Sequence, residues 1–216
     1  MTGGYAGKIL RIDLSSGRIT QSPTADYSDR FLGGRGIAAK VYWDEVPPGA
    51  KALDEENTVI FATGPIGGVP VFAGSRWTVC GKIPSVEHFS YGNFGGRWGA
   101  GIKFAGYDAI VVQGKSEKPV YIFIHDGTAE LKDASALWGK GAIDTREMMK
   151  GEFGESLRVV AIGQAGENMA VMANLIADND AAGSQGLGAA LGSKRLKAIA
   201  VKWEGKAISI AQPEKL

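Results

Sequence analysis

The residues of this 216-residue chain with the clearest chemical potential are glycines that gather in clusters. Glycine occurs 32 times, about twice the number expected at the usual ~7%. The clusters lie at 33–36, 64–68, 92–101 and 183–192. Glycine lets the main chain adopt positive φ and approach a ligand closely, so that backbone groups can surround an anion. The pattern therefore indicates sites for phosphate or another compact anion, although tight turns alone would also produce it.

The other reactive side chains are few. Cys80 is the only cysteine, which excludes a disulfide within the chain and any zinc or iron–sulfur site that needs several thiolates. Cys80 stands in an apolar segment and is expected to be a buried, inert thiol. His88 and His125 are isolated and are expected to be ordinary surface residues rather than ligands. Trp77 precedes the third glycine cluster and Trp98 lies within it, so both could pack on a ligand, but they are expected in the core or an interface.

Charge and hydropathy exclude several kinds of partner. The chain has 24 basic and 23 acidic residues, so the net charge of +1 does not indicate binding to nucleic acid or to an anionic membrane surface. No apolar run approaches the roughly 18 residues of a membrane span. With a single cysteine, a reducing, cytoplasmic location is expected.

Periodicity and turn residues predict an α+β fold that is rich in antiparallel sheet. Strands are expected in hairpins or singly at 9–14 with 19–20, 58–63, 75–80, 109–113, 120–125 with 129–131, 157–162, and 198–202 with 207–210. Helices are expected over 29–46 and 143–153. Because strands dominate and successive strands pair through turns, this class is favoured over a parallel α/β fold.

Two short segments repeat along the chain with a spacing of 89 residues. Residues 99–100 recur at 188–189, and the strand at 109–112 recurs at 198–201. This repeat predicts an internal duplication that produces two similar β-sheet halves, each with one glycine-rich loop. The two loops could then hold two equivalent phosphates. The match is short, so chance remains the alternative.

A further set of segments resembles a known family. The segments are Phe31-Leu32-Gly33-Gly34-Arg35-Gly36, Ala62-Thr63-Gly64-Pro65, and the runs at 103–110, 162–168 and 192–199. In order and spacing they resemble the N-terminal domain of the aldehyde:ferredoxin oxidoreductase family, from residue 7 to about 204.

The resemblance implies a cofactor-binding domain rather than a complete enzyme. Family members oxidise aldehydes to carboxylic acids, or reduce related carbonyl or aromatic compounds, at tungsten or sometimes molybdenum held by the dithiolenes of two pterins. The N-terminal domain forms a base of two β-sheets under this tungstopterin. Later domains carry a [4Fe–4S] cluster, through which electrons reach ferredoxin or a similar carrier. We therefore expect C-terminal domains of the same protein as partners, with homo-oligomerisation open, and the isolated chain to be inactive.

The resemblance also assigns roles to individual residues. Arg76 corresponds to an arginine that contacts the pterin, although alone it would be interpreted as a surface salt-bridge former. Asn93 and Gly95 correspond to a first phosphate-binding loop, and Ala181 and Gly183 to a second. A Mg²⁺ ion that joins the two pterin phosphates is implied, bound through the backbone carbonyls of Asn93 and Ala181. No catalytic residue is expected in this chain.

The second loop departs from the family pattern at two positions. The family has arginines before and after its Ala-Ala-Gly segment, where this chain has Asp180 and Ser184. Arginine is the natural bidentate partner of phosphate, whereas aspartate repels it. Weaker binding in the second half and a divergent subfamily are therefore expected, and arginine at either position should tighten binding. Asp108, Asp178 and Asp180 are expected as turn and cap residues rather than a metal cluster.

Residues 1–210 are predicted to form this domain, and residues 211–216 to begin a following one, because Pro213 is typical of the first turn of a helix. Two classes of function follow. The first is the cofactor-binding part of a tungsten or molybdenum oxidoreductase. The second is a non-catalytic, stand-alone subunit that carries or assembles metal-pterin, which a reading frame ending at Leu216 would favour. A β-domain without any ligand is disfavoured by the glycine clusters.

Overall fold

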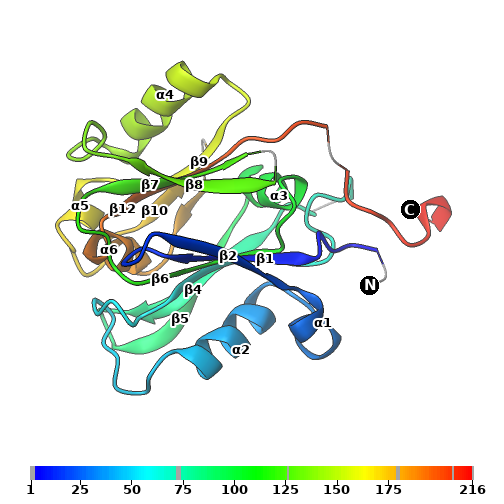
Figure 1. Cartoon of the computed structure of the whole chain (residues 1–216), viewed down its shortest axis with the longest axis horizontal. Coiled ribbons are helices and arrows are strands. Elements are labelled where there is room, and N and C mark those ends of the chain that lie inside the picture. Colours follow the sequence, from blue (N-terminus) through cyan, green and yellow to red (C-terminus); the bar gives the residue numbers. More distant parts are fainter. Residues whose placement is uncertain (1–2, 72–73, 126, 179–180, 206, 216) are drawn as a thin grey trace.

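The computed structural model describes the chain in five stretches, 3–71, 74–125, 127–178, 181–205 and 207–215. Two six-stranded sheets pack face to face and helices cover their outer sides, which gives four layers (Figure 1). The largest hydrophobic cluster lies between the sheets, since it combines side chains such as Phe61 and Ile110 of one sheet with Ile122 and Ile199 of the other. None of the helices in the described part of the chain has both the length and the apolar character needed to cross a bilayer.

The strand order is the same in both sheets. Sheet A runs β2 (Arg18–Pro23), β1 (Lys8–Asp13), β6 (Ala109–Gln113), β3 (Val59–Thr63), β4 (Trp77–Ile83), β5 (His88–Phe94). Sheet B runs β8 (Thr128–Asp133), β7 (Val120–His125), β12 (Leu196–Val201), β9 (Arg158–Ile162), β10 (Leu175–Ala177), β11 (Ala181–Gly183). Neighbours are antiparallel except β1 with β6 and β7 with β12. The predicted antiparallel-rich α+β fold with two similar halves is confirmed.

The helices follow the same duplication. The outer face of sheet A is covered by α1 (Ala25–Phe31) and α2 (Arg35–Glu45), and that of sheet B by α4 (Ala142–Phe153). Between the sheets lie α3 (Trp98–Phe104) and α6 (Leu187–Ser193), each directly before the third strand of its sheet. A short helix, α5 (Gln164–Glu167), follows β9.

The repeated strand occupies equivalent positions in the two sheets. In β6, Ala109 lies between its partners Ile9 and Ala62; in β12, Ala198 lies between Tyr121 and Ala161. The repeat spacing is not constant, because β4 and β5 have seven residues each whereas β10 and β11 have three each. After these hairpins come α3 and α6, which have seven residues each, and the sequence repeat is visible from these helices into the strands that follow them.

Several expected elements are wrong in detail. Residues 207–210 form no strand; instead they lie beside the N-terminal segment, where Ser209 O accepts a bond of 2.6 Å from Gly4 N (Figure 1). The reason is that the strand after β6 is β7, which belongs to the second sheet, so the repeat does not predict a strand of the second sheet after β12. The single helix expected over 29–46 is two helices, separated where Gly34 has φ of 50° and its N–H bonds Thr63 O. The turn expected at Pro213 is a 3₁₀ helix, Pro213–Lys215.

Aromatic side chains fill the centre of the first half. Trp77 and Trp98 are 1% and 0% exposed, as expected for core residues. The Trp77 ring stacks on Phe94 with centroids 4.3 Å apart and contacts Trp98 at 4.5 Å. Cys80 is also buried, and burial raises the pKa of its thiol to about 11, so the thiol stays protonated as expected of an inert residue.

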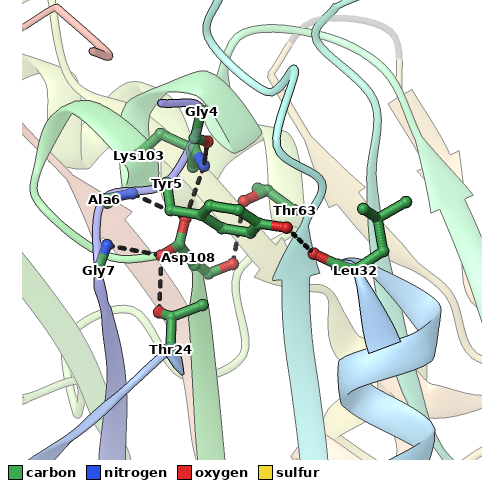
Figure 2. A network of polar contacts seen from close by, with 9 residues as sticks. All are labelled: Gly4, Tyr5, Ala6, Gly7, Thr24, Leu32, Thr63, Lys103 and Asp108. Atoms are coloured by element: carbon green, nitrogen blue, oxygen red, sulfur yellow. Dashed lines mark hydrogen bonds and ion pairs between the residues drawn. The ribbon is translucent and has the colours of Figure 1, made fainter. Parts of the chain in front are cut away.

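A buried ion pair fastens the N-terminal segment to the domain (Figure 2). Lys103 Nζ donates to Asp108 Oδ1 and to Gly4 O, at 2.6 Å each, and both side chains of the ion pair are almost fully buried. Asp108 accepts three further bonds, from Ala6 N, Gly7 N and Thr24 Oγ1. Burial lowers the pKa of Lys103, an effect that Asp108 opposes. Asp108 therefore has a structural role, in a buried ion pair rather than in the turn or cap that the sequence predicted.

Lys194 should give stability an unusual dependence on alkaline pH. Its side chain is fully buried and donates to Glu55 O (2.9 Å) and Gly114 O (3.0 Å), two acceptors that match the two N–H groups of a neutral amine. Burial lowers its pKa to about 8. Between pH 8 and about 10.4 the unfolded chain binds the extra proton, so the free energy of unfolding should rise with pH, by roughly 2–3 kcal/mol.

Urea unfolding of the wild type and of Lys194→Met at pH 7.5 and pH 10 would isolate this contribution. Other groups, including Tyr42 with a pKa raised by burial to about 12, titrate equally in both proteins and cancel in the difference. A difference that does not change between the two pH values would mean that burial does not lower the pKa of Lys194.

Candidate functional site

A hollow of about 720 Å³ opens where the edge strands of the two sheets meet. Contacts between β5 and the segment after β11 bring these edges together, since Ser90 Oγ lies 2.9 Å from Gln185 Oε1. The hollow is lined by Arg76, Asn93, Phe94, Gly95, Gly96, Arg97, Lys150, Glu155, Arg158, Asp178 and Ala182. Both halves of the duplicated fold therefore contribute to it.

The lining is positively charged. Four basic side chains face two acidic ones. Lys150 Nζ lies 3.5 Å from Glu155 Oε2, but the Glu155 side chain is 88% exposed, so this pair is weak. Arg158 uses Nη1 to bond the backbone carbonyls of Glu155 and Leu157, which are uncharged acceptors. A site with this excess of guanidinium and ammonium groups is suited to anions, above all to phosphate.

Three of the five residues that the sequence assigned to the site line the hollow, and the other two, Ala181 and Gly183, are direct neighbours of a lining residue. Arg76, Asn93 and Gly95 line the hollow, and so does Ala182, which stands between Ala181 and Gly183. Their secondary structure differs from the expected loops, because Asn93 belongs to β5, opposite Thr78, and residues 181–183 form β11. Both are edge strands, whose outer side leaves backbone groups unpaired by a neighbouring strand. Binding of a ligand by these residues stays a prediction.

The predicted glycines face open space. A Cβ at Gly95 would meet only Arg76 Nη1, at 3.8 Å, and a Cβ at Gly183 would meet nothing within 4 Å. Packing within the protein therefore does not require glycine at either position, although the φ of 154° at Gly183 favours glycine there. Gly96 differs, since its φ is 74° and a Cβ there would lie 2.6 Å from Asp178 Oδ2.

Buried groups hold the first loop in place. Trp77 Nε1 donates to Gly95 O at 3.0 Å, which ties the loop to the aromatic cluster. Asp178 Oδ2 accepts bonds from Arg97 N (2.5 Å) and Trp98 N (2.9 Å) at the start of α3. Arg146, which is 8% exposed on α4, donates to the carbonyl of Asp178. Asp178 is thus a cap residue, as expected.

The expectation for Ser184 is wrong. Ser184 is 2% exposed, and its Oγ accepts a bond from Leu175 N at 3.2 Å, so its side chain points into the protein rather than into the hollow. An arginine here could not reach a phosphate without displacing β10, and it would destabilise the fold rather than tighten binding. Asp180, the other departure, lies outside the described residues.

Eight lining residues were not named as site residues from the sequence: Phe94, Gly96, Arg97, Lys150, Glu155, Arg158, Asp178 and Ala182. Gly96 and Arg97 directly follow Gly95 and could have been found by extending that loop. Lys150 lies in the last turn of α4 and Arg158 begins β9, and no local pattern distinguishes them from surface cations. Among the described residues, no group of three or more His, Cys, Asp or Glu side chains is placed to hold a metal ion.

Comparison with known proteins gives consistent results. The family described as "Aldehyde ferredoxin oxidoreductase, N-terminal domain" matches residues 9–203, whereas the expected domain boundary at residue 210 stays a prediction. The tungsten-containing aldehyde ferredoxin oxidoreductase of Thermococcus kodakarensis is 42% identical over 215 residues, which cover 98% of this chain and 35% of that protein. The aliphatic sulfonate oxidoreductase, WOR-like subunit, of Pyrococcus furiosus is 32% identical over 233 residues, with 98% and 36% covered.

A solved structure has the same fold. It is the active site complex BamBC of benzoyl coenzyme A reductase in complex with 1,5 dienoyl-CoA, with a TM-score of 0.90 and 38% identity. The match covers 94% of this chain and 31% of that one. The chain thus spans about a third of the length of the relatives that it matches.

Proposed function

Because this chain belongs to the aldehyde ferredoxin oxidoreductase family, whose N-terminal domain it matches, we propose that its hollow holds the phosphate ends of a tungstopterin. The observation that carries the proposal is the convergence, on one cationic hollow, of glycine-containing segments from both halves of a duplicated fold. Two pterins would present two phosphates, and the two edge strands offer one backbone segment for each.

The residues present fit this cofactor. Arg76 supplies a charged contact, and Arg97, Lys150 and Arg158 supply further positive charge around the phosphates. The open space at Gly95 and Gly183 allows a phosphate to approach the main chain. Backbone carbonyls of Asn93 and Ala181, both on edge strands, would bind a Mg²⁺ ion between the phosphates, since magnesium prefers oxygen ligands.

For the whole protein, we propose oxidation of aldehydes to carboxylic acids, with electrons passing through a [4Fe–4S] cluster to ferredoxin. When bound, the tungstopterin supplies the redox chemistry, and this chain binds and orients it. We propose that the cluster and the groups around the metal are supplied by parts of the protein other than this chain. Relatives named for aldehydes and for aliphatic sulfonates match this chain at 42% and 32% identity, which supports a cofactor-binding domain common to enzymes with different substrates.

Substituting Arg76 tests the proposal. In the full-length protein, Arg76→Ala should lower the tungsten and pterin content and weaken retention of the cofactor, because a charge-assisted contact of about 1.5–3 kcal/mol is lost. The unfolding transition should not change, because Arg76 is exposed. Tungsten is measured by mass spectrometry of the metal, and pterin by the fluorescence of its oxidised form.

Arg30→Ala is a matched control, since Arg30 is an exposed arginine on α1, on the outer face of sheet A. If Arg76→Ala keeps the full tungsten content, the site assignment fails. A full-length protein that binds tungstopterin but does not reduce a viologen dye with any aldehyde would instead favour the non-catalytic carrier.

A further inference from the structure

Asp178 joins the two halves of the site through contacts at both its ends. Its carboxylate accepts two backbone bonds from residues 97 and 98, in the first half, at 2.5 and 2.9 Å. Its main chain directly follows β10, in the second half, where Arg146 bonds its carbonyl and its own N–H bonds Val159 O. Asp178 therefore connects the end of β10, in the second half, with residues 97 and 98, which follow β5 in the first half.

The neighbouring backbone is shaped around this contact. A side chain at Gly96 would lie 2.6 Å from Asp178 Oδ2, so glycine is needed there for the carboxylate to reach the start of α3. Asp178 itself has φ of 49°, a conformation that aspartate and asparagine adopt more readily than most other residues. Residue types on both sides of the contact thus suit the observed geometry.

The charge of Asp178 makes its position unexpected. Asp178 lines the same hollow as four basic side chains, so its carboxylate repels any anion that binds there. If affinity for phosphate were the only requirement, a neutral residue would serve better at this position. A role in geometry explains why a carboxylate occupies it.

We propose that Asp178 is a positioning residue that sets the distance between the two phosphate-binding segments. This inference rests on the proposed function. The carboxylate does not bind the cofactor; it holds the Gly95–Arg97 segment against the chain entering β11, so that both phosphates and the ion between them meet backbone groups at a fixed separation. The two N–H groups at the start of α3 are used for this contact and are therefore not available to the ligand.

The proposal is tested with three substitutions in the full-length protein. Asp178→Asn keeps an oxygen that can accept both bonds, and it removes the repelling charge. Asp178→Gly removes the side chain and tolerates the positive φ. Asp178→Glu keeps the charge but moves the carboxylate by one methylene group. The measured quantity is the rate of tungsten loss from purified protein during dialysis, with tungsten and pterin content per chain at the start.

We expect Asp178→Asn to retain tungsten at least as well as the wild type, and Asp178→Gly and Asp178→Glu to lose it about tenfold faster. Equal losses in Asp178→Asn and Asp178→Gly would overturn the positioning role, and so would wild-type retention in Asp178→Gly. Should Asp178→Gly fail to fold, the contrast between Asn and Glu decides. Failure of the proposed function is separate, since Arg76→Ala would then keep its tungsten.

Discussion

Asp108→Ala should lower the free energy of unfolding by about 3–5 kcal/mol, among the largest effects expected of any single change in this chain. The substitution leaves the Lys103 ammonium fully buried without its carboxylate partner, which lies 2.6 Å away. It also leaves the N–H groups of Ala6 and Gly7 without their acceptor. Urea unfolding followed by circular dichroism measures the loss.

Two controls separate the causes of that loss. Asp44→Ala removes a half-exposed partner of Lys40 on α2 and should cost less than about 1 kcal/mol. The double variant Lys103→Met with Asp108→Leu removes the unpaired charge as well and should recover part of the stability, but not the part due to the backbone N–H groups. An Asp108→Ala protein as stable as Asp44→Ala would show that the buried pair contributes little.

Local patterns in the sequence predict those parts of the fold that depend on neighbouring residues. The alternation at 9–14 and the strong strands at 109–113 and 120–125 are found where expected. The parallel pairing of β1 with β6 joins segments about a hundred residues apart, and no local pattern specifies it. The duplication could be detected only in the last part of each repeat. The β4–β5 hairpin is longer than the β10–β11 hairpin, so the sequence spacing between equivalent residues changes before α3.

The glycine clusters show the limit of composition as a signal. Gly95 and Gly183 face open space, as a ligand-binding role requires, but other members of the same clusters serve packing. A Cβ at Gly99 would lie 2.5 Å from the Trp77 ring, and a Cβ at Gly188 would lie 2.7 Å from Ala173 O. These two glycines are equivalent in the repeat, and each lets its helix lie against the start of a strand. Composition alone cannot separate the two uses, because both require close approach.

The candidate site was predictable only where its residues lie in short, recognisable segments. Asn93, Gly95 and Gly183 stand in such segments. Lys150 and Arg158 reach the hollow because α4 ends and β9 begins beside it, which depends on the packing of the second sheet. The inward orientation of Ser184 likewise depends on its bond to β10. Tertiary packing decides both cases.

Gly192→Ala should be the most damaging of the glycine substitutions. A Cβ at Gly192 would lie 1.8 Å from Gly166 O and 2.6 Å from its carbonyl carbon, both backbone atoms that cannot rotate away. The helix α6 cannot easily move away from Gly166, because Gly188, one turn earlier, lies against the backbone of Ala173 and Asn174. We therefore expect the free energy of unfolding to fall by about 3 kcal/mol, at the upper end of the cost of overpacking.

Gly192→Ala should also disturb the candidate cofactor site. Residues 184–186 connect β11 to α6, so any displacement of the helix moves β11 as well. Gly192→Ala in the full-length protein should therefore lose tungsten faster than the wild type, even under conditions where it stays folded. Gly151→Ala is the matched control: this glycine lies on α4 with nothing within 4 Å of an added Cβ, and alanine there should stabilise the helix by about 0.5–1 kcal/mol. If the two variants unfold at the same urea concentration, the contact between α5 and α6 is not the constraint described above.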